Sequence, residues 1–406
     1  MSLLSITILV ADNIADVGVE ALEQEGHTLV EGPDLSGEAL VDALRTEEPD
    51  VLIVRSTKIT PEALDASPSL ALIVRAGAGY DTIDVQGAAN RGIFVANCPG
   101  KNSVAVAELT MGLILSLDRR IPDNVVDARA GQWNKKEYAQ AAGLKGRTMG
   151  IIGLGNIGTE VMKRARAFDL NVIAWSRSLT PEVAEEAMGI GYREDPEAVA
   201  RDADIVSLHV ASTPETENLA DRSFFEALPE KALFVNTTRA AVVDEEALAW
   251  ALDEKDIRAG IDVMEGEPSA KRADFEHPLA DHPNLYMSHH IGASTQQAQD
   301  ATAMEAARVV RTFDTEGDVP NCVNLAEQTQ ATHQITVRHR DQVGVLAGVL
   351  DEMRRANWNI QEMSNRIFEG SQAAVASIRF SGPFSQDVVE RIDESDDVFA
   401  VSVNKI

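Results

Sequence analysis

The amino-acid sequence predicts an α/β protein with two doubly wound parallel-sheet domains and a smaller C-terminal domain of βαββαβ order. Three observations predict it: the length of 406 residues, short apolar runs that alternate with helical segments, and a different order of elements after residue 332. A chain of this length holds about two to four domains. Continuous apolar runs are typical of strands that are buried on both faces, as in parallel sheets.

The first predicted domain spans residues 1–100 and is completed by a helix at 290–320. Met1–Asp12 lacks the basic segment and long apolar core of a signal peptide, so it is expected to hold the first strand. The helical pattern of Ala293–Thr315 is expected to return to this domain. The predicted strands are the apolar runs Ile6–Val10, Val51–Arg55, Leu70–Arg75 and Ile93–Ala96.

The second predicted domain, residues 101–289, begins with a long helical stretch at Ser103–Gly131. Strands then alternate with helices, of which Asn156–Phe168 is the first. This alternation predicts a second parallel sheet. The predicted strands are Thr148–Ile152, Asn171–Trp175, Ile205–Leu208, Leu233–Asn236 and Ala259–Val263.

The third predicted domain, residues 333–406, follows the polar segment Glu316–Thr332, which is expected to be a linker. Its βαββαβ order is ferredoxin-like. The predicted strands are His333–His339, Asn359–Phe368, Gln372–Phe380 and Val398–Val403, and the predicted helices are Gly344–Ala356 and Ser385–Asp393.

Charge and cysteine content exclude several classes of function. The net charge of −29 argues against binding to nucleic acid or to anionic membranes. The sequence has no uncharged apolar stretch of about 18 residues, so no transmembrane helix is expected. Because Cys98 and Cys322 are the only cysteines, we expect no disulfide framework, no cysteine-built metal site and a reducing, cytoplasmic location.

A glycine motif predicts a dinucleotide site in the second domain. It follows the strand Thr148–Ile152 directly and opens a helix, which is the context that gives the motif its meaning. Its glycines permit a tight turn, a close approach to a pyrophosphate and close helix packing, so the fold is expected to be Rossmann-like. The motif residues are Gly153, Gly155, Asn156, Ile157 and Gly158.

The end of the next strand leaves the choice of dinucleotide open. An NAD site usually has an acidic residue there, which binds the ribose hydroxyls. Here the strand ends in Ser176 and Arg177, a pair that suits a 2′-phosphate. The alternative is that Arg177 is a solvated residue that stacks on the adenine. The expected cofactor is NAD, with NADP possible, and the pair Ser176 and Arg177 favours use of both dinucleotides or a bias toward NADP.

Three later segments carry the residues suited to catalysis. Arg239 follows the strand Leu233–Asn236, Asp262 precedes Glu267, and His290 stands two residues before Gly292. In order and spacing these segments and the glycine motif resemble the D-isomer-specific 2-hydroxyacid dehydrogenases. His289, where the family has proline, and Ala240, where it usually has glycine, are departures.

The resemblance implies a role for each of these residues. His290 would be the base that takes the hydroxyl proton, and Glu267 would orient it. Arg239 would bind the substrate carboxylate and polarise the carbonyl. Thr237 and Asp262 would contact the cofactor, the latter at the nicotinamide carboxamide. Glu265 and His289 remain the alternatives to Glu267 and His290.

Two strand ends of the first domain resemble the family's substrate loops. The resemblance implies that Arg75, Ala76 and Gly77 meet the substrate carboxylate. In members that act on 3-phosphoglycerate, an arginine and hydroxyls at the other loop meet the phosphate. The residues at that loop are Arg55, Ser56 and Lys58, and Asn102 is expected near the same cleft.

The C-terminal domain resembles an ACT domain, a small-molecule sensing module. In relatives inhibited by L-serine, the positions that match His339, Asp341 and Asn359 contact the effector. Val343 stands where such domains usually have proline. The alternative is a dimerisation module without a ligand, and a homodimer or homotetramer is expected.

The whole pattern implies one function and leaves two alternatives. It implies NAD(P)-dependent oxidation of 3-phospho-D-glycerate to 3-phosphooxypyruvate, the first step of L-serine biosynthesis. The first alternative is an NADPH-dependent glyoxylate or hydroxypyruvate reductase. The second is a non-catalytic dinucleotide-sensing regulator, against which the intact Arg239, Glu267 and His290 argue.

Overall fold

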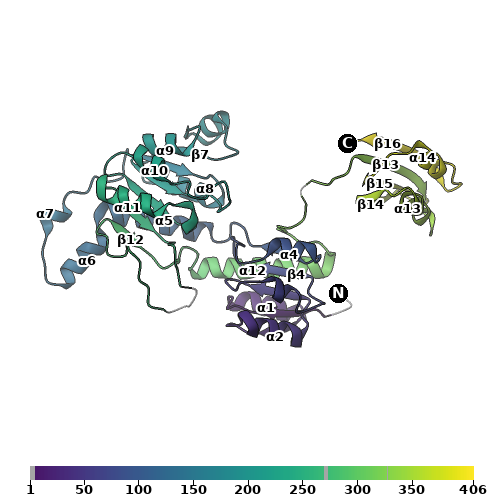
Figure 1. Cartoon of the computed structure of the whole chain (residues 1–406), viewed down its shortest axis with the longest axis horizontal. Coiled ribbons are helices and arrows are strands. Elements are labelled where there is room, and N and C mark those ends of the chain that lie inside the picture. Colours follow the sequence, from purple (N-terminus) through teal and green to yellow (C-terminus); the bar gives the residue numbers. More distant parts are fainter. Residues whose placement is uncertain (1–4, 269–272, 327) are drawn as a thin grey trace. The chain divides into compact units, whose positions relative to one another are not determined.

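The computed structural model describes residues 5–268, 273–326 and 328–406 and divides into two compact units, Met1–Asn324 and Leu325–Ile406 (Figure 1). Unit 1 contains two parallel sheets, and unit 2 contains one antiparallel sheet. The α/β fold class predicted from the sequence is confirmed. The exact bounds of the two domains within unit 1 stay a prediction.

The first sheet of unit 1 has five parallel strands in the order β2-β1-β3-β4-β5. Strand β2 is not among the predicted strands, because it is a half-exposed edge strand without a continuous apolar run. The strands are β1 (Thr7–Val10), β2 (Thr28–Glu31), β3 (Val51–Val54), β4 (Leu72–Arg75) and β5 (Phe94–Asn97). The helices are α1 (Asp16–Gln24), α2 (Gly37–Glu47), α3 (Pro61–Leu64) and α4 (Val85–Asn90).

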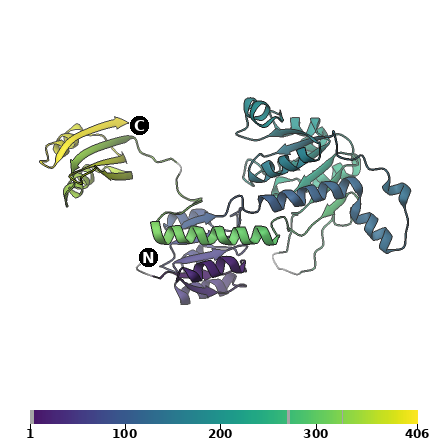
Figure 2. The same cartoon turned by 180° about the vertical axis from the view of Figure 1, so that it is seen from behind.

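Helix α12 (Gln296–Glu316) returns to the first sheet and lies beside α1, as Figures 1 and 2 show. Gly18 allows this close approach, because a Cβ atom at that position would lie only 2.7 Å from the Cβ of Ala303. The predicted return of this helix is confirmed.

The second sheet has seven parallel strands in the order β12-β11-β10-β9-β6-β7-β8. The chain runs outward from β6 to β8 and then crosses back to β9, so the order reverses between β6 and β9. In such sheets ligands bind at the carboxyl ends of the strands at this switch point. The strands are β6 (Thr148–Ile152), β7 (Asn171–Trp175), β8 (Gly191–Tyr192), β9 (Ile205–Leu208), β10 (Leu233–Asn236), β11 (Arg258–Ile261) and β12 (Leu285–Met287).

The expectation of one continuous helical stretch over Ser103–Gly131 is wrong. The chain breaks at Arg120, which adopts a left-handed φ of 50°, and Pro122 follows in the first turn of a new helix. The helices around the second sheet are α5 (Ser103–Arg119), α6 (Ile121–Arg129), α7 (Lys135–Tyr138), α8 (Asn156–Ala167), α9 (Pro196–Asp202), α10 (Arg222–Ala227) and α11 (Glu245–Glu254). A π-helical turn, η1 (Val183–Met188), and a 3₁₀ turn, η2 (Ala240–Val242), complete them.

Unit 2 has the predicted βαββαβ order. Its antiparallel sheet runs β14-β15-β13-β16, which is the ferredoxin-like arrangement. The helices bury Val349, Met353, Val388 and Ile392 against the sheet. The elements are β13 (His333–Arg340), α13 (Val345–Arg355), β14 (Asn359–Ile367), β15 (Ala373–Ser381), α14 (Gln386–Asp393) and β16 (Val398–Lys405).

The described ranges lack two features that would indicate other classes of site. No helix in them has the length and apolar character needed to cross a membrane. The same ranges contain no group of three or more His, Cys, Asp or Glu side chains arranged to hold a metal ion.

Candidate active site

The glycine motif forms the turn between β6 and α8. Gly153 has a left-handed φ of 97°, and a Cβ atom there would lie 2.6 Å from the carbonyl oxygen of His209. A Cβ atom at Gly158 would lie 2.0 Å from the carbonyl oxygen of Gly153. Both positions therefore require glycine. The N-terminus of α8 carries no side-chain cap, so its first N–H groups can donate hydrogen bonds to phosphate oxygens.

A cavity of about 170 Å³ lies beside this turn. Of the predicted cofactor residues, Gly153, Gly155, Ser176 and Arg177 line it, whereas Asn156, Ile157 and Gly158 do not. The residues after β9 that line the cavity were not predicted from the sequence. The predicted strand Ile205–Leu208 was a signal for them, because parallel strands end at the same edge of a sheet. The further lining residues are Trp175, His209, Val210, Ala211, Thr213 and Thr216.

His209 gives this cavity a neutral wall. Burial lowers the pKa of His209 to about 3. Its Nε2 lies 2.9 Å from the hydroxyl of Ser207, and its buried Nδ1 has no partner among the described residues. An imidazole in this environment stays uncharged at neutral pH.

His290 and Glu267 are joined as the sequence predicts. Nδ1 of His290 lies 2.8 Å from Oε2 of Glu267, whose other oxygen accepts the N–H of Met264 at 2.8 Å. Burial raises the pKa of the Glu267 carboxyl, but these two hydrogen bonds and the nearby charge of Arg239 bring it below its usual range. With Nδ1 engaged, Nε2 of His290 is left to exchange a proton with a substrate.

Asp262 holds the loop that carries His290. Only 2% of Asp262 is exposed, and its oxygens accept the N–H groups of Ile291 and Gly292 at 2.9 and 2.8 Å. The same carboxylate accepts the hydroxyl of Ser288 at 2.6 Å. The expected contact of Asp262 with the nicotinamide carboxamide stays a prediction, and the bonds described here show that the same carboxylate also fixes the loop.

Arg239 is held by a residue that the sequence reasoning missed. Its Nη2 lies 3.0 Å from Oδ1 of Asp81, and its Nη1 donates to the carbonyl of Thr238 at 2.8 Å. A Cβ atom at Gly79 would lie 2.1 Å from Nη2, so this glycine leaves room for the guanidinium group. Thr237, a predicted cofactor residue, is buried with its hydroxyl 3.3 Å from that of Thr110.

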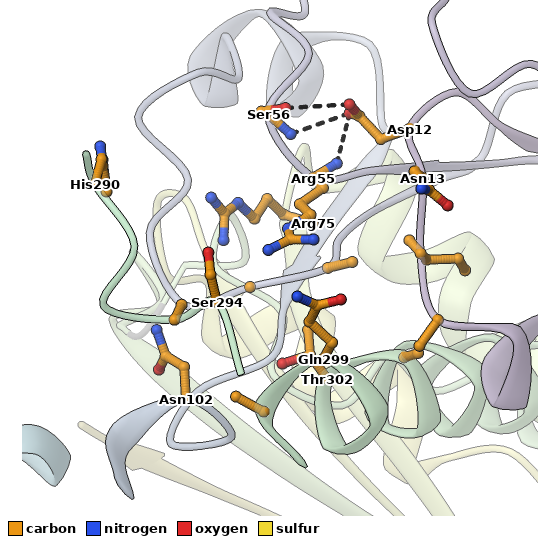
Figure 3. Close-up of a pocket in the computed structure, with 17 residues that line it drawn as sticks. Asp12, Asn13, Arg55, Ser56, Arg75, Asn102, His290, Ser294, Gln299 and Thr302 are labelled. Carbon is orange, nitrogen blue, oxygen red and sulfur yellow. Dashed lines mark hydrogen bonds between the residues drawn. The ribbon is translucent and has the colours of Figure 1, made fainter. Parts of the chain in front are cut away.

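A larger cavity, of about 490 Å³, lies at the carboxyl edge of the first sheet (Figure 3). Lys58, a predicted substrate residue, is exposed and does not line it. The sequence reasoning missed the contributions of the β1 loop and of α12, which come from distant segments. The predicted residues that line the cavity are Arg55, Ser56, Arg75, Ala76, Gly77, Asn102 and His290, and the missed polar ones are Asp12, Asn13, Ser294, Gln299 and Thr302.

Arg75 is a half-buried cation in this cavity. Burial, and then the charge of Arg239, lower the pKa of Arg75 to about 10, and Arg55 adds to the effect. Its Nε is buried and has no partner among the described residues. A Cβ atom at Gly77 would lie 1.4 Å from Nη1 of Arg75, so glycine is required for this side chain to fit.

The three predicted effector residues of unit 2 do not meet within one chain. Ala374 of β15 lies opposite both His339 and Ile367, whereas Asn359 lies opposite Ser381. Asn359 is therefore eight positions along β14 from Ile367, the residue in register with His339, or roughly 26 Å at the usual rise of a strand. His339 is also buried, with its ring nitrogens 2.8 Å from the carbonyl of Arg340 and 3.3 Å from Oδ1 of Asn365.

Comparison with known proteins agrees with this geometry. Residues 111–292 match the family model described as D-isomer specific 2-hydroxyacid dehydrogenase, NAD binding domain. The glyoxylate reductase of Thermococcus litoralis is 37% identical over 289 residues, which cover 69% of this chain and 85% of that protein. The chain belongs to the D-isomer-specific 2-hydroxyacid dehydrogenase family.

Relatives in this family carry different names. The D-3-phosphoglycerate dehydrogenase of Methanocaldococcus jannaschii is 38% identical over 308 residues, which cover 75% of this chain and 57% of that protein. The chain thus matches little more than half the length of that relative. The solved structure of NAD⁺-bound 3-phosphoglycerate dehydrogenase from Entamoeba histolytica has a TM-score of 0.66 and 27% identity, covering 79% of this chain and 99% of that one.

Membership identifies the protein as an oxidoreductase with an NAD-binding domain, and the glycine motif lies within the matched range. A bound nicotinamide dinucleotide would accept or give the hydride. The parts of the chain that fit this dinucleotide are the glycine turn, the uncapped N-terminus of α8, and Ser176 and Arg177, which line the smaller cavity.

We expect His290→Ala to lower kcat by at least about 10²-fold, because it removes the proton acceptor. The dissociation constant for NADH, measured by fluorescence titration, should barely change, since the glycine turn is untouched. His289→Ala is the matched control and should stay active. A dead His289→Ala with an active His290→Ala would assign the base to His289.

We expect Arg177→Ala to separate the two dinucleotides. If Arg177 meets a 2′-phosphate, its loss should raise KM for NADPH by at least about 10-fold, the value of one hydrogen bond to a charged group. KM for NADH should stay nearly unchanged and serves as the internal control. Equal effects on both cofactors in steady-state assays would show that Arg177 does not read the 2′ position.

Proposed function

We propose that this dehydrogenase oxidises 3-phospho-D-glycerate to 3-phosphooxypyruvate with NAD, as the first step of L-serine biosynthesis. The observation that carries the proposal is the half-buried Arg75 beside Arg55 and Arg239. Of the three, Arg239 is paired with Asp81, whereas Arg55 and Arg75 have no ion-pair partner in the described ranges. Two unpaired guanidinium groups suit a substrate with a second anionic group.

The charge of the substrate distinguishes this proposal from the alternative. Glyoxylate and hydroxypyruvate each carry one carboxylate, which a single arginine can neutralise. Phosphoglycerate carries a carboxylate and a phosphate, so it can neutralise more of the cationic cluster. A chain of net charge −29 repels anions, so an anionic substrate needs a local cluster of arginines at its binding site.

A chemical role for each residue follows from the proposal. Arg239 binds the carboxylate of the substrate and polarises its carbonyl in the reverse direction. Nε2 of His290 accepts the proton of the substrate hydroxyl while the hydride leaves the carbon that bears this hydroxyl. Glu267 stabilises the protonated ring through Nδ1. Arg55 and Arg75 hold the phosphate and with it the orientation of the reacting carbon.

An NADPH-dependent reductase of glyoxylate or hydroxypyruvate is the second candidate. Two observations favour it: the Thermococcus relative named glyoxylate reductase and the absence of a carboxylate after β7, where Ser176 and Arg177 stand.

We also propose that unit 2 is an ACT domain whose effector is L-serine. Because Asn359 lies at the far end of β14, a site that includes it with Asp341 needs a second copy of the chain. Asp341 would pair with the ammonium group of serine, and Asn359 of the other copy would bind its carboxylate. The proposal therefore requires a homodimer or a homotetramer.

The substrate proposal is tested by comparing 3-phospho-D-glycerate with D-glycerate, which has the same carbon skeleton without the phosphate. We expect a kcat/KM ratio of at least about 10, and Arg55→Ala should reduce it mainly through KM. Lys58→Ala, three residues further along, is the control and should leave the ratio unchanged. A ratio near one, together with fast reduction of glyoxylate, would favour the second candidate.

The effector proposal predicts that millimolar L-serine inhibits turnover of the full chain. A chain lacking residues 333–406 should be active and insensitive, because an effector can act only through sites that it binds. Asp341→Ala and Asn359→Ala should each abolish binding of serine in calorimetry, yet their mixture should regain part of it, since one hybrid site is intact. No heat of binding and no inhibition of the full chain would contradict the proposal.

A further inference from the structure

The loop that carries Arg55 is organised around one carboxylate, that of Asp12. Asp12 follows β1, and β1 pairs with β3, so the two loops lie at the same edge of the first sheet. Oδ2 of Asp12 accepts three consecutive backbone N–H groups, from Arg55 at 2.7 Å, Ser56 at 3.0 Å and Thr57 at 2.9 Å. Its Oδ1 accepts the hydroxyl of Ser56 at 3.1 Å.

Consecutive N–H groups that point at one place form a concave site for an anion. In this protein the anion is part of the chain itself. Burial raises the pKa of the Asp12 carboxyl, but the hydrogen bonds from Arg55, Thr57 and Ser56 bring it below its usual range, so it is ionised at neutral pH. Figure 3 shows the bonds from Arg55 and Ser56 at the wall of the larger cavity, with the side chains of Arg55 and Arg75 extending into it.

This arrangement changes what the loop can offer to a substrate. The N–H groups of residues 55–57 and the hydroxyl of Ser56 are already used by Asp12, although Ser56 was expected to meet the phosphate. The cationic group that remains available from this loop is the guanidinium of Arg55. Its position depends on the backbone that Asp12 fixes.

We propose that Asp12 is a positioning residue that sets the selectivity for substrates with a second anionic group, because it fixes the loop from which Arg55 reaches the cavity. This inference rests on the proposed function. It adds that recognition of the phosphate depends on a carboxylate that does not touch the substrate. Removing Asp12 leaves three N–H groups without an acceptor, so the loop can relax or can take the phosphate itself at a displaced position.

The test compares Asp12→Ala and Asp12→Asn with the wild-type chain on 3-phospho-D-glycerate and on D-glycerate. Both variants should raise KM for the phosphorylated substrate by about 10-fold or more, since a displaced binding group misplaces the substrate. Their kcat should change little, and their KM for D-glycerate should stay close to that of the wild type. Asp16→Asn is the matched control, because it removes the same charge from an exposed site on α1.

Chemical rescue separates positioning from general damage to the fold. Asp12→Ala leaves space for a small carboxylate, so added acetate should occupy the vacated N–H groups and lower KM for 3-phospho-D-glycerate toward the wild-type value. The same acetate should not improve the wild type or Asp16→Asn. A thermal unfolding curve recorded for each variant shows whether the fold is retained.

The outcomes distinguish a failure of the proposed function from a failure of the role proposed for Asp12. A wild-type enzyme that does not prefer the phosphorylated substrate contradicts the proposed function. A wild-type enzyme that prefers it, with Asp12→Ala retaining the full preference, overturns the role of Asp12 alone. Equal losses on both substrates without rescue by acetate would also overturn it, because they would show a structural role only.

Discussion

Mutual repulsion among the guanidinium groups of Arg55, Arg75 and Arg239 is the constraint on which the rest of the substrate site depends. Burial is the largest cause that lowers the pKa of Arg75, and the like charges of Arg239 and then of Arg55 lower it further, to about 10. The chain supports the cluster in two ways. Asp81 pairs with one member, and the backbone at Gly77 and Gly79 leaves the space that the side chains fill.

Carboxylates bound to backbone N–H groups form the second layer of this design. Asp12 binds residues 55–57, Asp262 binds the loop that carries His290, and Glu267 binds Met264 while it orients His290. Each carboxylate fixes a loop, so the reactive groups start from a defined backbone. Functional side chains work only when their supports are rigid, which is the general requirement for a preorganised site.

The sequence predicted the parts of this architecture that depend on local pattern. β6, β7, β9 and β10 have the predicted bounds, because they are apolar runs at the centre of a sheet. The short or edge strands β2, β8 and β12 carry too weak a pattern to be found. The same division holds for the site: the glycine turn and the pair of His290 and Glu267 lie in recognisable motifs. Asp81 was missed because its partner Arg239 is 158 residues away, and Asp12 because its partners are 43 to 45 residues away.

Both cavities are proposed to bind an anion although the chain is strongly acidic. They differ in the kind of positive charge that they offer. The dinucleotide cavity uses partial charges: the uncapped N-terminus of α8 and the backbone after Gly153, beside a histidine that burial keeps neutral. The substrate cavity uses full charges that burial leaves poorly compensated. Partial charges suit a pyrophosphate, which many proteins bind through the backbone alone. Full charges are costly to bury, and a bound anion offsets that cost with its own charge. The proposed phosphorylated substrate would offset more of it than glyoxylate, because it carries a second anionic group.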